Sequence, residues 1–203
     1  RPSNGGKTDY HPFVLGYTPN EVEKEYFLGE ARQIAAYFSG PEPILDENAT
    51  AEELRRQAPS AGWVHLSCHG YFNSRDPLAS SVLLSGGEFT ARDWMSLSLQ
   101  AELVTLSACQ TGFSDVSPGD EIAGLSRSLF YAGAQAVLLT LWSVRADTTL
   151  EWMLDFYRRV WTPQGTPRCS KVLAFQQAVL ALRKKYPDNP AIWAPFILMG
   201  NAL

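Results

Sequence analysis

The sequence predicts an α/β fold with a mainly parallel central sheet and helices on both of its faces. Three short apolar runs, beginning at Trp63, Leu103 and Ala136, are typical of strands that are buried on both sides. Amphipathic helical segments alternate with these runs along the chain. Because strands that alternate with helices pair in parallel through right-handed crossovers, the order of the elements favours this class over an all-α or all-β fold.

The size and composition indicate one folded domain. The chain has 203 residues, 45% of them hydrophobic, and six are tryptophan, which is enough to build a sizeable core. Residues 1–11 are polar and glycine-rich, so we expect a linker or disordered end there and the folded domain over residues 12–203. Since the chain begins with Arg1 and not with Met, we expect it to be part of a longer protein.

Charge and cysteine content exclude several classes of function. A net charge of -4, with one basic cluster at Arg183–Lys185, gives no electrostatic basis for binding nucleic acid. No apolar run has the length of a membrane span, and no signal peptide is evident, so we expect no membrane association. The three cysteines are odd in number and irregularly spaced, which predicts a reducing, cytoplasmic compartment without a disulfide framework.

The N-terminal part of the domain predicts a strand followed by a helix. Phe13–Tyr17 has the composition of a short strand, and Thr18–Glu21 has the pattern of a capping box with proline at the first helical position. Apolar residues then recur at helical spacing and should form one buried face: Phe27, Ala31, Ile34 and Phe38. Gly40 and Pro41 should end this helix.

The other elements follow from caps, turns and periodicity. In chain order we expect a strand at Ile44–Leu45, a capped helix from Thr50 to Gln57, a hairpin of Val82–Leu84 and Glu88–Phe89, a helix from Thr90 to Met95, helices over 120–132, 150–160 and 172–186, and a last strand at Phe196–Met199.

Two of the buried strands end in residues that carry chemistry. The run WVHLSCHG ends at His69, and the run LVTLSACQTG changes from apolar to polar at Cys109. Ligands of open α/β sheets bind beyond the carboxyl ends of the strands, and neighbouring strands lie about 4.8 Å apart. If the two strands are neighbours, a thiol and an imidazole share one cleft as nucleophile and base. Gly70 follows His69, so a backbone N–H there can approach a ligand closely.

The cysteines and histidines near these strand ends also allow structural or metal-binding roles. Cys68 and Cys169 are more simply explained as a packed core residue and a bystander, and His65 as a buried mid-strand residue. A zinc site would need His65, Cys68, His69 and Cys109, but strand alternation sends Cys68 to the opposite face, and no CxxC or HExxH spacing is present. We therefore expect no metal and no cofactor.

Several segments in a fixed order resemble one family. They are VHLSCHGYFN, LVTLSACQTG, GDEIAGLSRSLFYAGAQAVLLTLWSV and IWAPFILMGN, and over residues 13–201 the chain resembles the CHAT family of caspase-like cysteine proteases. The resemblance implies a caspase-like sandwich and cleavage of peptide bonds by a dyad of Cys109 and His69. It also implies that the N–H groups of Gly70 and Cys109 hold the oxyanion. A third, orienting acid is not evident in the sequence.

The resemblance also bears on partners and specificity. Family members are usually fused to tetratricopeptide repeats or other sensor modules, so the implied partners are a protein substrate and such a module. Ser107 stands where metacaspases place the acid that binds a basic P1 residue, which argues against an Arg or Lys requirement. Asp120, Glu121 and Asp147 are candidates for the cleft, although each stands at a predicted helix N-terminus, where a carboxylate is favoured anyway. The alternatives are a non-cleaving CHAT scaffold and an acyl hydrolase acting on a small molecule.

Overall fold

The computed structural model describes residues 11–38, 41–73, 75–110, 120–142, 144–162, 167–201 and 203. For residues 108–110 and 120–123 the description covers the backbone only. The expectation for residues 1–11 therefore lies almost wholly outside the described part of the chain.

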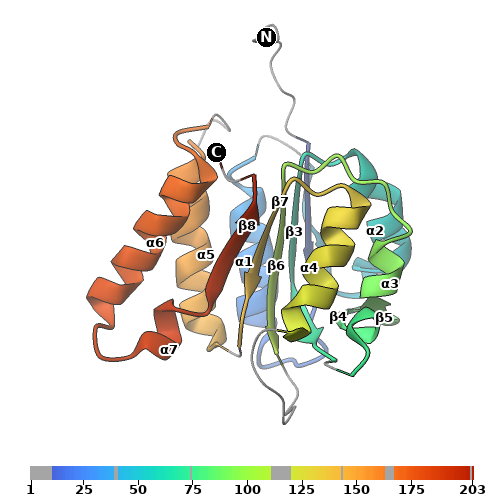
Figure 1. The fold of residues 1–203 in the computed structure, drawn as a ribbon, viewed down its shortest axis with the longest axis horizontal. Coiled ribbons are helices and arrows are strands. Elements are labelled where there is room, and N and C mark those ends of the chain that lie inside the picture. The colour runs from blue at the N-terminus through green and yellow to red at the C-terminus, as the bar shows by residue number, and fades with distance from the viewer. Residues whose placement is uncertain are drawn as a thin grey trace, which may run out of the picture.

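An eight-stranded sheet forms the centre of the domain (Figure 1). Its main path runs β2-β1-β3-β6-β7-β8, in which β8 alone pairs in antiparallel fashion. A hairpin of β4 and β5 is attached to the end of β3. The strands are β1 (Pro12–Gly16), β2 (Ile44–Leu45), β3 (Trp63–Tyr71), β4 (Ser81–Leu84), β5 (Gly87–Thr90), β6 (Leu103–Gln110), β7 (Ala136–Thr140) and β8 (Phe196–Gly200).

Helices cover both faces of this sheet, as the sequence predicts. One face packs against α1 (Lys24–Ala35), α5 (Ala146–Val160) and α6 (Lys171–Lys185), and α7 (Pro190–Trp193) packs on α6. The other face packs against α2 (Ala51–Gln57), α3 (Ala91–Trp94) and α4 (Asp120–Ala132). Figure 1 shows the two groups on opposite sides of the strands. Within the described ranges, no helix combines the length and the apolar character that crossing a membrane requires.

Strand alternation divides the core into two layers. On β3, Val64, Leu66 and Cys68 belong to the layer beneath α2, α3 and α4, whereas Trp63 belongs to the layer beneath α1, α5 and α6. Cys68 is fully buried, in agreement with a packing role. Each layer excludes water from one face of the sheet, so the central strands are held from both sides.

The prediction for the start of the first helix is wrong. The helix α1 begins at Lys24, and its N-cap residue, Glu23, makes no capping hydrogen bond through its side chain. Thr18 is fully buried, and its hydroxyl accepts a hydrogen bond from the N–H of Asn20 at 3.1 Å, which closes a local turn. The Thr18 hydroxyl therefore stabilises a turn six residues before α1 begins and does not cap the helix. The predicted buried face is nevertheless correct, since Phe27, Ala31, Ile34 and Phe38 are all buried.

The strand that carries His69 is longer than the sequence indicates. The sequence predicts a run that ends at His69, but β3 continues to Tyr71 because β4 pairs with its last residues, Gly70 and Tyr71. The hairpin turn uses Gly86 and Gly87, both at positive φ. The position after His69 therefore remains inside a hydrogen-bonded sheet and does not lie in a loop.

Candidate active site

The backbone register places His69 and Cys109 side by side. The strands β3 and β6 are parallel neighbours, paired from Trp63↔Leu103 to Gly70↔Gln110, with His69 directly opposite Cys109. Residues opposite each other in a sheet occupy the same face, so these two positions share the face covered by α1 and α5. The side chain of Cys109 lies outside the described part of the chain. The predicted neighbourhood of the two strands is confirmed.

His69 is a buried residue with three contacts at its ring. Its side chain is 9% exposed, and its Nε2 atom lies 2.9 Å from the hydroxyl oxygen of Thr18 and 3.2 Å from Oε2 of Glu23. The ring of Phe27 packs against the imidazole with centroids 4.7 Å apart. The other ring nitrogen, Nδ1, is buried and has no hydrogen-bond partner among the described residues.

Two opposing effects act on the protonation of His69. Burial removes water from the imidazolium form and lowers the pKa of His69 below its ordinary value of 6.5. The carboxylate of Glu23 acts in the opposite direction, through its charge and its hydrogen bond, but burial is the larger effect. The ring is therefore mostly neutral at pH 7, which is the form a base needs in order to accept a proton from a thiol.

A buried polar network lies deeper on the same face of the sheet. His65 contacts Oε1 of Glu30 through Nε2 at 3.0 Å and the hydroxyl of Tyr157 through Nδ1 at 3.1 Å. The Tyr157 hydroxyl donates in turn to the hydroxyl of Thr105 at 3.0 Å. The network joins α1, β3, α5 and β6, four residues below the His69–Cys109 pair along each strand. It fixes both helices that border the site.

Ser107 lines a narrow pocket beside the network. The pocket has about 10 Å³ of free volume, which is about the room that one water molecule needs. Glu30 reaches this pocket, but its side chain is 4% exposed and paired with His65. The full lining is Tyr26, Phe27, Glu30, Ser67, Ser107, Ala146 and Thr149.

The other predicted site residues are spread over the domain. Gly70 is buried next to His69, between Val82 of β4 and Gln110 of β6. Asp120 and Glu121 begin α4, and their side chains lie outside the described part of the chain. Asp147 lies in the first turn of α5 and forms a bidentate ion pair with Arg145, in which Nε and Nη2 of the arginine donate to the two carboxylate oxygens at 3.0 and 2.8 Å. This ion pair, together with a hydrogen bond from the backbone N–H of Thr148, lowers the pKa of Asp147.

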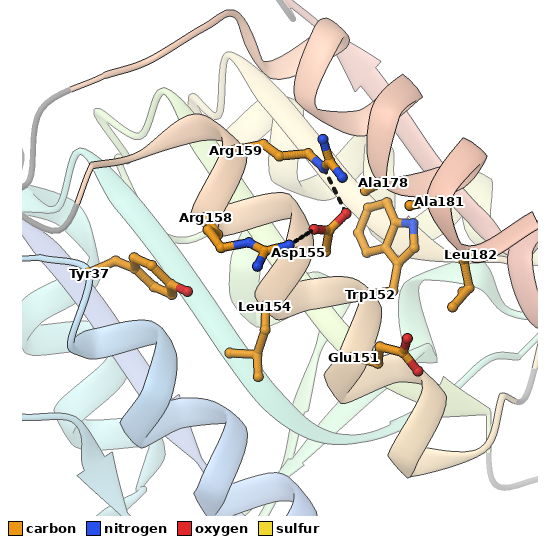
Figure 2. Close-up of a pocket in the computed structure, with 10 residues that line it drawn as sticks. All are labelled: Tyr37, Glu151, Trp152, Leu154, Asp155, Arg158, Arg159, Ala178, Ala181 and Leu182. Atoms are coloured by element: carbon orange, nitrogen blue, oxygen red, sulfur yellow. Dashed lines mark hydrogen bonds and ion pairs between the residues drawn. The ribbon is translucent and has the colours of Figure 1, made fainter. Parts of the chain in front are cut away.

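A larger groove lies away from His69. Figure 2 shows it between α5, α6 and the end of α1. Its volume is about 480 Å³. Within the groove, Arg158 and Arg159 both form ion pairs with Asp155, so these three charges are already paired within the protein. Its lining contains neither His69 nor its neighbours, and it is lined by Tyr37, Glu151, Trp152, Leu154, Asp155, Arg158, Arg159, Ala178, Ala181 and Leu182.

Among the described residues, no group of three or more His, Cys, Asp or Glu side chains is arranged to hold a metal ion. His65 in particular is engaged at both ring nitrogens by Tyr157 and Glu30.

The family follows from the sequence as a whole. A sequence profile described as the CHAT domain matches residues 17–201, which is most of the chain. The chain belongs to the CHAT domain family. Among curated proteins, this CHAT domain is 31% identical over 112 residues to tetratricopeptide repeat protein 28 of Homo sapiens and equally to that of Mus musculus. The match covers 55% of this chain and only 4% of each relative, so the chain corresponds to a small part of those proteins.

Solved structures show that the fold of this CHAT domain is caspase-like. It resembles the Saccharomyces cerevisiae separase in the separase–securin complex with a TM-score of 0.59 at 14% identity, covering 95% of this chain and 12% of that one. It also resembles the Arg-specific cysteine proteinase gingipain R with a TM-score of 0.61 at 12% identity, covering 94% of this chain and 45% of that one. The identities are low, so the likeness concerns the fold.

Sequence reasoning missed the two groups that contact Nε2 of His69. The pattern at Thr18 predicts a helix cap, and nothing in the sequence marks Glu23 as a site residue. A signal for Thr18 exists in hindsight: it follows the strand β1, which pairs in parallel with β3, so the carboxyl ends of both strands meet at one edge of the sheet. Glu23 carries no comparable signal, because its position depends on where α1 begins.

Proposed function

We propose that this CHAT domain is a cysteine endopeptidase that cleaves a protein substrate through Cys109 and His69. One observation carries the proposal. The β3–β6 register puts a cysteine position directly opposite a buried histidine, at the carboxyl ends of two central strands and on one face of the sheet. The CHAT family match and the caspase-like fold support the same class of reaction.

The proposed reaction uses the ordinary two steps of a cysteine peptidase. His69 takes the proton of the Cys109 thiol, and the thiolate attacks the scissile carbonyl carbon. The oxyanion is held by the N–H groups of Gly70 and Cys109, a contribution of about 3 kcal/mol per donor. The imidazolium then protonates the leaving amine as the C–N bond breaks. In the second step His69 removes a proton from water, which releases the acyl group and regenerates the thiol.

The pocket beside Ser107 bears on specificity. A free volume of about 10 Å³ does not admit a lysine or arginine side chain, and the one carboxylate in its lining, Glu30, is paired with His65. We therefore propose that the residue before the scissile bond is not basic. Asp120, Glu121 and Asp147 remain candidates for contacts further along the substrate, and Asp147 would first have to leave Arg145.

We further propose that a repeat or sensor module controls the activity. The support is that the human and mouse relatives are named as tetratricopeptide repeat proteins, and that the matched part is a small fraction of each. On this proposal the module lies in the same protein or in a partner chain.

The test compares Cys109→Ala with Cys169→Ala in the full-length protein. Cys169 is partly buried and donates a hydrogen bond to the carbonyl of Arg159, away from β3, so its loss should leave the site intact. We expect the wild type and Cys169→Ala to cleave members of a peptide library and to react with an electrophilic peptide probe. Cys109→Ala should do neither. Undiminished cleavage by Cys109→Ala would reject the assignment, and absence of both activities in the wild type would favour a non-cleaving scaffold.

A further inference from the structure

We propose that Glu23 and Thr18 are positioning residues for His69, so that the site is a cysteine–histidine–glutamate arrangement with a supporting threonine. This inference rests on the proposed peptidase function. Its starting point is that one atom, Nε2 of His69, contacts both side chains, at 3.2 and 2.9 Å. The sequence predicts a dyad without such a group.

Thr18 reaches the imidazole because of the sheet topology. The strand β1 pairs in parallel with β3 up to Gly16↔Ser67, and the next residue, Tyr17, donates its N–H to the carbonyl of Ser67 at 2.9 Å. The chain therefore arrives beside His69 in a fixed register. The hydroxyl of Thr18 is fully buried and is held in place by the N–H of Asn20.

Glu23 reaches the same nitrogen from the N-terminus of α1. Its side chain is 35% exposed, so it borders the site from the solvent side. Phe27 lies one helical turn further along and packs against the imidazole, with the two ring planes tilted by 43°. The helix thus supplies both a charge and a flanking surface. Of the charged side chains in the described residues, Glu23 is the one in contact with the ring, and the adjacent Lys24 is paired with Glu21 and Asp46.

These contacts select one tautomer of His69. A carboxylate accepts hydrogen bonds and cannot donate them, so Nε2 facing Glu23 is favoured as the N–H nitrogen. The lone pair of the neutral ring then lies on Nδ1, the nitrogen that is buried without a partner among the described residues. Nδ1 is therefore the atom that can take the proton of Cys109.

The carboxylate also favours the charged state that forms next. Transfer of the thiol proton to Nδ1 creates a thiolate and an imidazolium, and the side chain of Glu23 contacts this imidazolium at Nε2. An opposite charge at hydrogen-bond distance stabilises the imidazolium, which offsets part of the effect of burial. Glu23→Gln retains the size of the side chain and removes the charge, so it isolates this contribution.

The test measures the rate at which iodoacetamide alkylates Cys109 between pH 5 and pH 9, followed by peptide mapping. We expect Glu23→Gln to move the midpoint of the alkylation rate profile to higher pH and to slow alkylation at pH 6 roughly three- to tenfold. The effect is limited to this range because solvent screens the partly exposed charge of Glu23. Glu25→Gln, an exposed carboxylate one residue beyond Lys24, is the matched control and should follow the wild type. Thr18→Val should shift the profile in the same direction, whereas Thr18→Ser, which keeps the hydroxyl, should follow the wild type.

Two results would overturn the proposal in distinguishable ways. If His69→Gln alters the profile and Glu23→Gln does not, the peptidase dyad stands and the positioning role is wrong. If the wild type behaves as an ordinary thiol and His69→Gln has no effect, both the dyad and the positioning role are wrong. Nitrogen NMR of labelled histidine supplies a second readout: at pH 7.5 the neutral ring of His69 should carry its proton on Nε2, and a neutral ring with its proton on Nδ1 would refute the inference.

Discussion

The buried network behind the site yields a quantitative prediction about stability. Tyr157 is fully buried on α5, and its hydroxyl has partners at 3.1 Å on His65 and at 3.0 Å on Thr105. Burial raises the pKa of Tyr157 well above its ordinary value of 10.0, so the hydroxyl stays protonated at any working pH. The substitution Tyr157→Phe removes this hydroxyl and retains the ring.

The expected loss follows from the groups left behind. The ring contacts with Phe38, Trp63 and Phe156 are kept, at centroid distances of 6.2, 5.9 and 5.4 Å, so little packing is lost. Two hydrogen bonds disappear, and two buried polar atoms lose a partner, which together cost about 2–3 kcal/mol of unfolding free energy. For a domain of this size that loss lowers the melting temperature by roughly 4–12 °C.

Urea unfolding followed by tryptophan fluorescence measures this loss directly. Tyr131→Phe is the matched control, because Tyr131 is 73% exposed and the same substitution there should change the free energy of unfolding by less than about 0.5 kcal/mol. The urea dependence of that free energy should be unchanged in both variants. A loss for Tyr157→Phe as small as that of the control would show that the network does not stabilise the domain.

Two further predictions concern close packing and pH. Gly124→Ala should lower the free energy of unfolding in urea by about 1–3 kcal/mol, because the added Cβ would lie 2.3 Å from the backbone oxygen of Pro77. Gly29→Ala in α1 is the control: its Cβ would meet nothing within 4 Å, so it should raise the free energy of unfolding by about 0.5–1 kcal/mol. Equal changes in the free energy of unfolding for the two variants would contradict this prediction. Because the pKa of His69 is lowered, the unfolded chain binds its proton more readily, so the stability of the wild type relative to His69→Gln should fall as the pH drops below 6.5. A difference that stays constant from pH 7.5 to pH 5 would refute the lowered pKa.

Much of the fold is predictable because its signals are local. The apolar runs at β3, β6 and β7 indicate strands buried on both faces, and each is found where the sequence predicts it. Thr50 and Thr90 cap α2 and α3 through their hydroxyls, as their patterns predict. These features depend on residues within about one turn of each other, so the sequence contains what is needed to recognise them.

The candidate pair is also a consequence of local patterns, combined with one rule of sheet topology. His69 and Cys109 each stand near the end of an apolar run, and parallel strands bring their carboxyl ends to one edge. The sequence by itself does not show that β3 and β6 are neighbours, because the order of strands in a sheet is set by the tertiary structure. The roles of both residues remain predictions for the experiments above.

The surroundings of His69 depend on the tertiary structure. Thr18 looks like a helix cap when only its neighbours in sequence are considered, yet its hydroxyl lies against a histidine 51 residues away. Glu23 contacts the same histidine because α1 begins at Lys24, a boundary set by how the helix packs on the sheet. The sequence alone determined the strands, most helices and the two residues at the strand ends. Only the folded chain decided which groups surround the imidazole, because contacts between distant segments depend on packing and leave no local pattern.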